Sequence, residues 1–162
     1  KRQVIDRAPD PLSISEVKLE GGYGYHQTEP APKLSAALNL TIEASVSLKA
    51  NGAWQLIAAV PDVFDLRLMD DRIRFSLWTI DGAVARIDTV AKALLDPKPH
   101  DLAVVFDGLS GEITLFLDGA EAGRKSASFG PVNYLPTQRL YVGGAPWGLI
   151  FEGRIGALKI SR

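Results

Sequence analysis

The strictest pattern in this sequence is an alternation of apolar and polar side chains over residues 38–48. Leu, Ile, Ala and Val occupy every even position from 38 to 48, and Asn, Thr, Glu and Ser occupy the odd positions between them. Successive side chains of a β-strand point to opposite faces of the sheet, so this period of two predicts a strand with one buried face.

Other short apolar runs, separated by turn residues, follow along the chain. Residues 100–106 and 113–117 are rich in β-branched and aromatic side chains, and the second run is followed by Asp118-Gly119, a dipeptide that favours tight hairpin turns. Further turn signals lie at Asn51-Gly52, Asp70-Asp71, Asp81-Gly82 and Asp107-Gly108. Only residues 91–95 favour a helical turn. The number of runs and their regular spacing predict an all-β fold of two antiparallel sheets, a sandwich or jelly roll.

The length and composition of the chain indicate one domain held by packing alone. A chain of 162 residues can bury roughly 68–70% of the surface that it exposes when unfolded. It has no Cys, which excludes disulfides and thiolate metal sites. Residues 1–11 are polar and contain two prolines, so we interpret them as an N-terminal arm or linker, and residues 12–162 as the domain. We expect this unit to be a module of a longer protein.

The charge distribution excludes two classes of partner. The formal net charge is −1, and no basic stripe is present that would favour nucleic acid or an anionic membrane surface. No apolar run approaches the length of a membrane span.

Four segments together resemble the laminin G-like, concanavalin A-like jelly-roll domains. The segments are LTIEA at residues 40–44, HDLAVVFDGLSGEITLFLDG at 100–119, RLYVGG at 139–144 and FEGRIG at 151–156. They occur in the order of that family and extend the resemblance from about residue 17 to residue 160. The resemblance implies a two-sheet jelly roll, with a structural role for His100. It also leaves calcium open, because some of these domains hold one Ca²⁺ at the rim.

The residues give no support for catalysis. Glycoside hydrolysis requires two carboxyl groups about 5–9.5 Å apart, which on a strand usually appear as acids two or four residues apart. The acids instead cluster at turn tips, where side-chain to backbone hydrogen bonds explain them. His26 lies in a loop and has no partner motif, and Trp54 is interpreted as a core residue. We therefore assign neither catalytic residues nor metal ligands.

Aromatic side chains in loops are the clearest binding signal. An exposed Trp or Tyr offers a flat apolar surface with a polar handle, which suits the C–H face of a sugar. Trp147 lies in a Gly- and Pro-rich loop, and Trp78 is out of phase with the buried positions of its strand. The candidate ligand-binding residues are Trp147, Tyr23, Tyr25, Tyr134, Trp78 and Arg139.

We interpret the domain as a non-catalytic recognition module that binds carbohydrate or protein, and as an accessory domain of a larger bacterial enzyme or surface protein. One alternative is a structural domain that docks on a partner chain or a neighbouring domain through Trp78 or the arm of residues 1–11. A glycan-cleaving enzyme is the less favoured third hypothesis. An extracellular or cell-surface location is slightly favoured.

Overall fold

The computed structural model describes residues 12–19, 25–30, 39–126, 132–133 and 139–161. Within these residues the chain is almost entirely β-structure, with one short 3₁₀ helix, η2. The elements are β1 (Leu12–Leu19), β2 (His26–Pro30), β3 (Asn39–Leu48), β4 (Gln55–Val60), β5 (Phe64–Met69), β6 (Arg72–Trp78), β7 (Val84–Val90), η2 (Lys92–Leu95), β8 (His100–Asp107), β9 (Glu112–Leu117), β10 (Ala120–Ser126), β11 (Arg139–Val142) and β12 (Gly153–Ser161).

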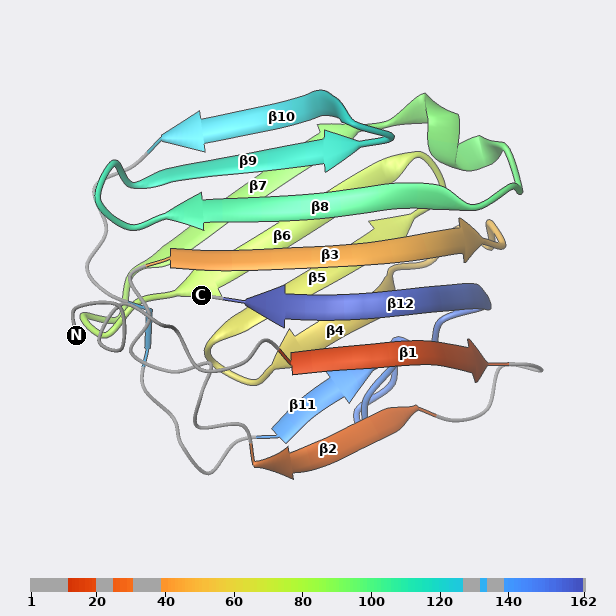
Figure 1. Ribbon diagram of the computed structural model, residues 1–162, viewed down its shortest axis with the longest axis horizontal. Helices are drawn as coiled ribbons and strands as arrows, with labels where there is room; N and C mark the ends of the chain where they lie inside the picture. Colours follow the sequence, from red (N-terminus) through yellow and green to blue (C-terminus); the bar gives the residue numbers. More distant parts are fainter. Residues whose placement is uncertain (1–11, 20–24, 31–38, 127–131, 134–138, 162) are drawn as a thin grey trace, which may run out of the picture.

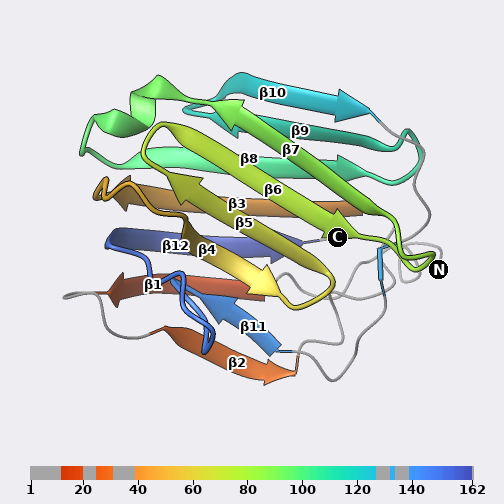
Figure 2. The same cartoon turned by 180° about the vertical axis from the view of Figure 1, so that it is seen from behind.

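The strands form two antiparallel sheets that lie face to face (Figures 1 and 2). Sheet A has the order β1-β12-β3-β8-β9-β10, and sheet B has the order β2-β11-β4-β5-β6-β7. The strands of sheet B run obliquely behind those of sheet A in Figure 1. Hairpins connect β4 to β7 and β8 to β10 in series, whereas β12 pairs with β1 and β3, and β11 pairs with β2 and β4. The predicted two-sheet jelly roll is confirmed.

The core lies between the two sheets and is one continuous apolar cluster. In β3 the even positions from Leu40 to Leu48 are buried and the odd positions face outward, as the alternation predicts. The inward-facing residues include Leu40, Ile42, Val104, Leu115 and Val142, each no more than 1% exposed. Because hydrophobic burial is the main favourable term in folding, the inner faces of both sheets supply most of the stability.

Three local predictions have different outcomes. The prediction that His26 lies in a loop is wrong, because this residue begins β2 and pairs with Val142 of β11. The helical turn expected at residues 91–95 is observed as η2. The assignment of Trp54 to the core is wrong, because its ring is half-buried and lies under the guanidinium of Arg74, 4.2 Å from the ring centroid. Trp54 immediately precedes β4, and the outward-facing Arg74 retains the indole on the surface through a cation–π contact. No helix among the described residues is long and apolar enough to cross a membrane.

Candidate functional site

The outward face of sheet B carries a row of side chains that four strands bring into register. Tyr141 of β11 pairs with Ala59 of β4, Ala59 pairs with Asp65 of β5, and Asp65 pairs with Ser76 of β6. Directly paired residues of antiparallel strands project to the same side of a sheet. An aromatic ring, a small residue and a carboxylate therefore lie side by side on this face.

A hollow of about 300 Å³ lies over part of this row. Its volume is at the lower end of the roughly 300–1,000 Å³ of small-molecule sites. We call it the tryptophan hollow, because two indole rings from distant parts of the chain contribute to its lining. The lining residues are Ala59, Pro61, Asp62, Phe64, Asp65, Arg67, Trp78 and Trp147.

A tight turn presents Trp147 to this hollow. The backbone N–H of Ala145 donates to the carbonyl of Gly148 at 3.1 Å, and the N–H of Gly148 donates back to Ala145 at 2.9 Å. Gly148 has a φ of 114°, which favours glycine. Trp147 at the tip is 55% exposed, and its ring centroid lies 5.2 Å from that of Tyr141 in an edge-to-face arrangement. The indole is therefore both accessible and held in place.

The polar lining of the tryptophan hollow includes an ion pair with unused hydrogen-bonding capacity. Arg67 and Asp65 lie two residues apart on β5, and the Nη2 of Arg67 is 2.6 Å from the Oδ2 of Asp65. The second carboxylate oxygen, Asp65 Oδ1, and the Nε of Arg67 are buried and have no hydrogen-bond partner among the described residues. Buried polar groups of folded proteins are usually hydrogen-bonded, so these two atoms require an explanation.

A second charged group further along the same face is fully paired. Arg72 and Arg74 of β6 both bind the carboxylate of Asp88 on β7, at 2.8 and 2.6 Å. Burial opposes ionisation of Asp88, but hydrogen bonds and the positive charge of the two guanidinium groups outweigh it and lower its pKa. This cluster satisfies its own hydrogen bonds, in contrast to Asp65 and Arg67.

Two of the six predicted binding residues lie in the tryptophan hollow, two lie near Tyr141, and two lie outside the described residues. Trp147 and Trp78 meet in the tryptophan hollow. Tyr25 immediately precedes β2, is 36% exposed, and has its ring 5.8 Å from Tyr141. Arg139 is half-buried on β11, two residues before Tyr141. Tyr23 and Tyr134 lie outside the described residues.

Sequence reasoning missed two residues of this face, Asp65 and Tyr141. Asp65 and Arg67 are separated by one apolar residue in β5, which places both side chains on the outward face. Tyr141 lies between two residues that point into the core and must also face outward. The period of two could have identified both positions.

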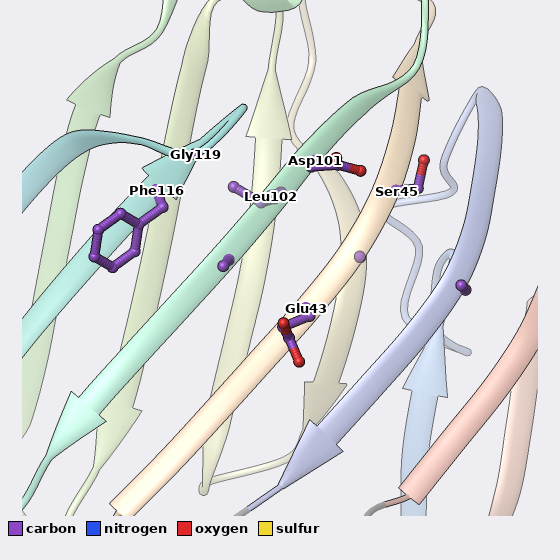
Figure 3. A pocket seen from close by; sticks show the side chains of 9 residues that line it. Glu43, Ser45, Asp101, Leu102, Phe116 and Gly119 are labelled. Carbon is purple, nitrogen blue, oxygen red and sulfur yellow. The ribbon is translucent and has the colours of Figure 1, made fainter.

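Sheet A also has a hollow on its outward face, of about 450 Å³ (Figure 3). Its lining residues are Glu43, Ala44, Ser45, Asp101, Leu102, Ala103, Phe116, Gly119 and Ala157. Ser45 of β3 and Asp101 of β8 are register partners, whereas Glu43 lies two residues away on β3 and points elsewhere (Figure 3). Phe116 supplies the one aromatic ring of this lining. The arrangement is a wide depression with little convergent chemistry.

The turn-tip acids act as predicted, through hydrogen bonds that hold the turns. Asp70 accepts from the backbone N–H groups of Asn51 and Gly52 at 3.1 and 3.0 Å. Asp107 accepts from the N–H of Leu109 at 2.9 Å. Among the described residues, no group of three His, Cys, Asp or Glu side chains is placed to hold a metal ion.

His100 has the structural role that the family resemblance implied. Its ring is 2% exposed, Nδ1 lies 2.7 Å from Oδ2 of Asp118, and Nε2 lies 3.0 Å from the carbonyl oxygen of Asp96. Both partners are acceptors, so the two ring nitrogens can both donate only when the imidazole is protonated. The hydrogen bond to Asp118 accordingly raises the pKa of His100. The interaction clamps the β9–β10 turn to the segment before β8.

Comparisons with known proteins agree with this architecture. The chain resembles the CBM40 domain of the Ruminococcus gnavus IT-sialidase, solved with α2,3-sialyllactose, at a TM-score of 0.74 and 17% identity, over 92% of this chain and 90% of that one. It also resembles domains LG4-5 of the mouse laminin α1 chain, at a TM-score of 0.65 and 22% identity, over 94% of this chain and 42% of that one.

Two comparisons use the sequence alone. No curated protein sequence matches the chain. A family model of laminin G type, described as the concanavalin A-like lectin/glucanases superfamily, matches residues 20–162. That match covers most of the chain, and the chain belongs to the concanavalin A-like lectin/glucanases superfamily.

Proposed function

We propose that the domain is a non-catalytic recognition module that binds a glycan in the tryptophan hollow. The observation that carries this proposal is the unsatisfied pair Asp65 Oδ1 and Arg67 Nε at a hollow lined by Trp78 and Trp147. Sugars combine an apolar C–H face, which packs on aromatic rings, with hydroxyl groups that both donate and accept hydrogen bonds. Both halves of this chemistry are present in one place.

The two unsatisfied atoms suggest how a ligand is held. The Arg67 side chain is 28% exposed and that of Asp65 is 8% exposed, so a ligand meets the guanidinium first. We expect Arg67 to turn toward a ligand oxygen, which frees Asp65 to accept from a ligand hydroxyl. Each group that gains a partner in this way recovers part of the roughly 1–3 kcal/mol that an unpaired buried group costs.

The same ion pair argues against Asp65 as the acid of a glycosidase. A glycosidase needs one carboxylic acid that is protonated and can donate to the leaving oxygen. Asp65 instead accepts a hydrogen bond from Arg67 at 2.6 Å. An accessory role in a larger enzyme or surface protein is supported by the neighbours, because the CBM40 domain with the same fold is part of a sialidase.

The alternative of a structural docking domain stays a prediction. Trp78, one of the two features that suggested it, lines the tryptophan hollow, and the arm of residues 1–11 lies outside the described residues.

Isothermal titration with α2,3-sialyllactose, lactose and a broader glycan panel tests the proposal. These two sugars come first because the CBM40 neighbour was solved with sialyllactose. We expect Trp147→Ala to weaken binding of the best ligand by about tenfold or more, because a central aromatic anchor contributes most of the affinity of such a site.

Two matched variants serve as controls. Trp54→Ala removes an indole from the same sheet that lies over Arg74 and is not part of the lining of the hollow. Phe116→Ala removes the ring from the hollow of sheet A. We expect both to leave affinity within about twofold of the unmodified domain. No binding by any glycan, or equal loss from Trp54→Ala and Trp147→Ala, would contradict the proposal.

A further inference from the structure

We propose that Tyr141, Tyr25 and Gln27 form a second subsite beside the tryptophan hollow, so that the domain takes a linear oligosaccharide of at least two sugar units. The proposal rests on the function proposed above and specifies its ligand class. It assigns the hollow to one sugar unit and the second subsite to a neutral unit linked to it.

An aromatic ladder leads from the tryptophan hollow toward the edge of sheet B. The ring centroids of Trp147 and Tyr141 are 5.2 Å apart, and those of Tyr141 and Tyr25 are 5.8 Å apart. Both contacts are edge-to-face, so successive rings turn different faces outward. Because each centroid separation is comparable to the width of a ring, the ladder extends the apolar surface by the length of about one further sugar unit.

Backbone geometry holds Tyr25 in this ladder. Gly144 has a φ of 137°, and a Cβ atom added there would lie 2.7 Å from Cδ1 of Ile150 and 3.5 Å from Cβ of Tyr25. The absence of a side chain at Gly144 therefore lets its loop pack closely against Ile150 and Tyr25. Tyr25 remains 36% exposed in this position, which leaves ring surface for a ligand.

Gln27 supplies the polar component of the second subsite. It is the register partner of Tyr141 across β2 and β11, and it is exposed. Cross-strand partners project to the same side, so the amide lies beside the ladder. A neutral amide donates and accepts hydrogen bonds, which matches sugar hydroxyls.

The two subsites differ in charge. The tryptophan hollow includes Asp62, Asp65 and Arg67 in its lining, whereas the second subsite is formed by two Tyr side chains and one Gln side chain. A neutral sugar unit suits the second subsite, because Tyr25, Tyr141 and Gln27 offer no charge that would compensate for the desolvation of an anion.

The test compares ligands of different length on the intact domain. Titrations use free N-acetylneuraminic acid against α2,3-sialyllactose, and galactose against lactose. We expect the longer member of at least one series to bind about fivefold to tenfold more tightly. Tyr25→Ala should abolish this gain from chain length while leaving the shorter ligand unchanged, whereas Trp147→Ala should weaken both members of the series.

Gln27→Ala keeps the ladder and removes the amide, and we expect it to reduce the same gain in part. Leu109→Ala, at a turn residue that is 84% exposed, is the control for loss of an exposed apolar side chain. Equal affinity for short and long ligands in the unmodified domain would overturn the second subsite and leave the hollow as a single-sugar site. If the domain binds no member of either series and no glycan of the broader panel, both proposals are overturned.

Discussion

The outward faces of the two sheets differ, although their inward faces are equivalent. On sheet A, β3 turns Thr41, Glu43, Ser45 and Ser47 outward, and the depression beside them is lined largely by small residues. Both outward faces carry ion pairs, such as Arg124 with Glu112 on sheet A and Arg67 with Asp65 on sheet B, but the cation–π contact and the aromatic ladder lie on sheet B. Both sheets contribute their inner faces to one core.

This contrast separates the requirements of stability from those of recognition. Large aromatic and arginine side chains on an exposed sheet face contribute little to the core, and an unpaired group such as Asp65 Oδ1 reduces stability. The proposed binding site lies on sheet B because the two indole rings and the unsatisfied atoms are found on its outward face.

The largest expected effects test whether the inner faces are equivalent. Ile42→Ala in sheet A and Leu66→Ala in sheet B each remove a side chain that is 0% exposed. We expect each substitution to lower the free energy of unfolding by about 2–5 kcal/mol, through lost burial and the cavity that remains. Chemical denaturation measures both values, and a loss below about 1 kcal/mol for either variant would show that the sheets contribute unequally.

The next effect concerns the titrating group of sheet A. The pKa of His100 is raised by Asp118, so its contribution to stability is complete below the unfolded pKa of about 6.5 and is lost as the pH rises through the folded pKa. We expect His100→Gln to cost about 1–3 kcal/mol near pH 6 and to remove this alkaline loss of stability. Denaturation midpoints between pH 5 and pH 9, approximately the range around an ordinary His pKa, provide the measurement.

Asp118→Asn is the matched variant, because it removes the charge and retains an oxygen that can accept from the backbone N–H of Asp101. It should flatten the same part of the pH profile. If the unmodified domain and His100→Gln lose stability in parallel above neutral pH, the clamp is not the cause.

The smallest effect concerns the ion pairs of sheet B. The pKa of Asp88 is lowered, so its contribution is present above the unfolded pKa of about 3.9 and is lost as the pH falls through the folded pKa. We expect Asp88→Asn to cost about 1 kcal/mol at neutral pH and to reduce the acid sensitivity of unfolding. Glu43→Gln, in an exposed pair with Lys159 on sheet A, should cost less than about 0.5 kcal/mol. Similar costs for the two variants would remove the electrostatic difference between the faces.

Local pattern predicted those parts of the fold whose partners are close in sequence. The hairpin of β5 and β6 and the strand β3 follow from alternation and turn residues. β10 gave little signal, since its side chains are mostly polar and exposed. The pairing of β1 with β12 and of β2 with β11 joins opposite ends of the chain, and no local pattern encodes such partners.

The sequence predicted several residues of the candidate site, but it did not predict that they lie close together. Trp147 and Trp78 were each identified from their local context, but their meeting depends on the order of strands in sheet B. The sequence pattern assigned Trp54 to the core, and this was wrong. The cation–π contact with Arg74 that keeps Trp54 at the surface forms only when the strands pair in the folded sheet. The unsatisfied atoms of Asp65 and Arg67 become visible only when every neighbouring donor and acceptor is placed.

The two reciprocal hydrogen bonds of the turn from Ala145 to Gly148 have a thermodynamic consequence. They fix the backbone around Trp147 during folding, so a molecule that docks on the indole does not have to immobilise a loose loop on arrival. The entropic cost of ordering this turn is therefore part of folding and not of binding. Differences in affinity among related ligands should arise mainly from their dissociation rates.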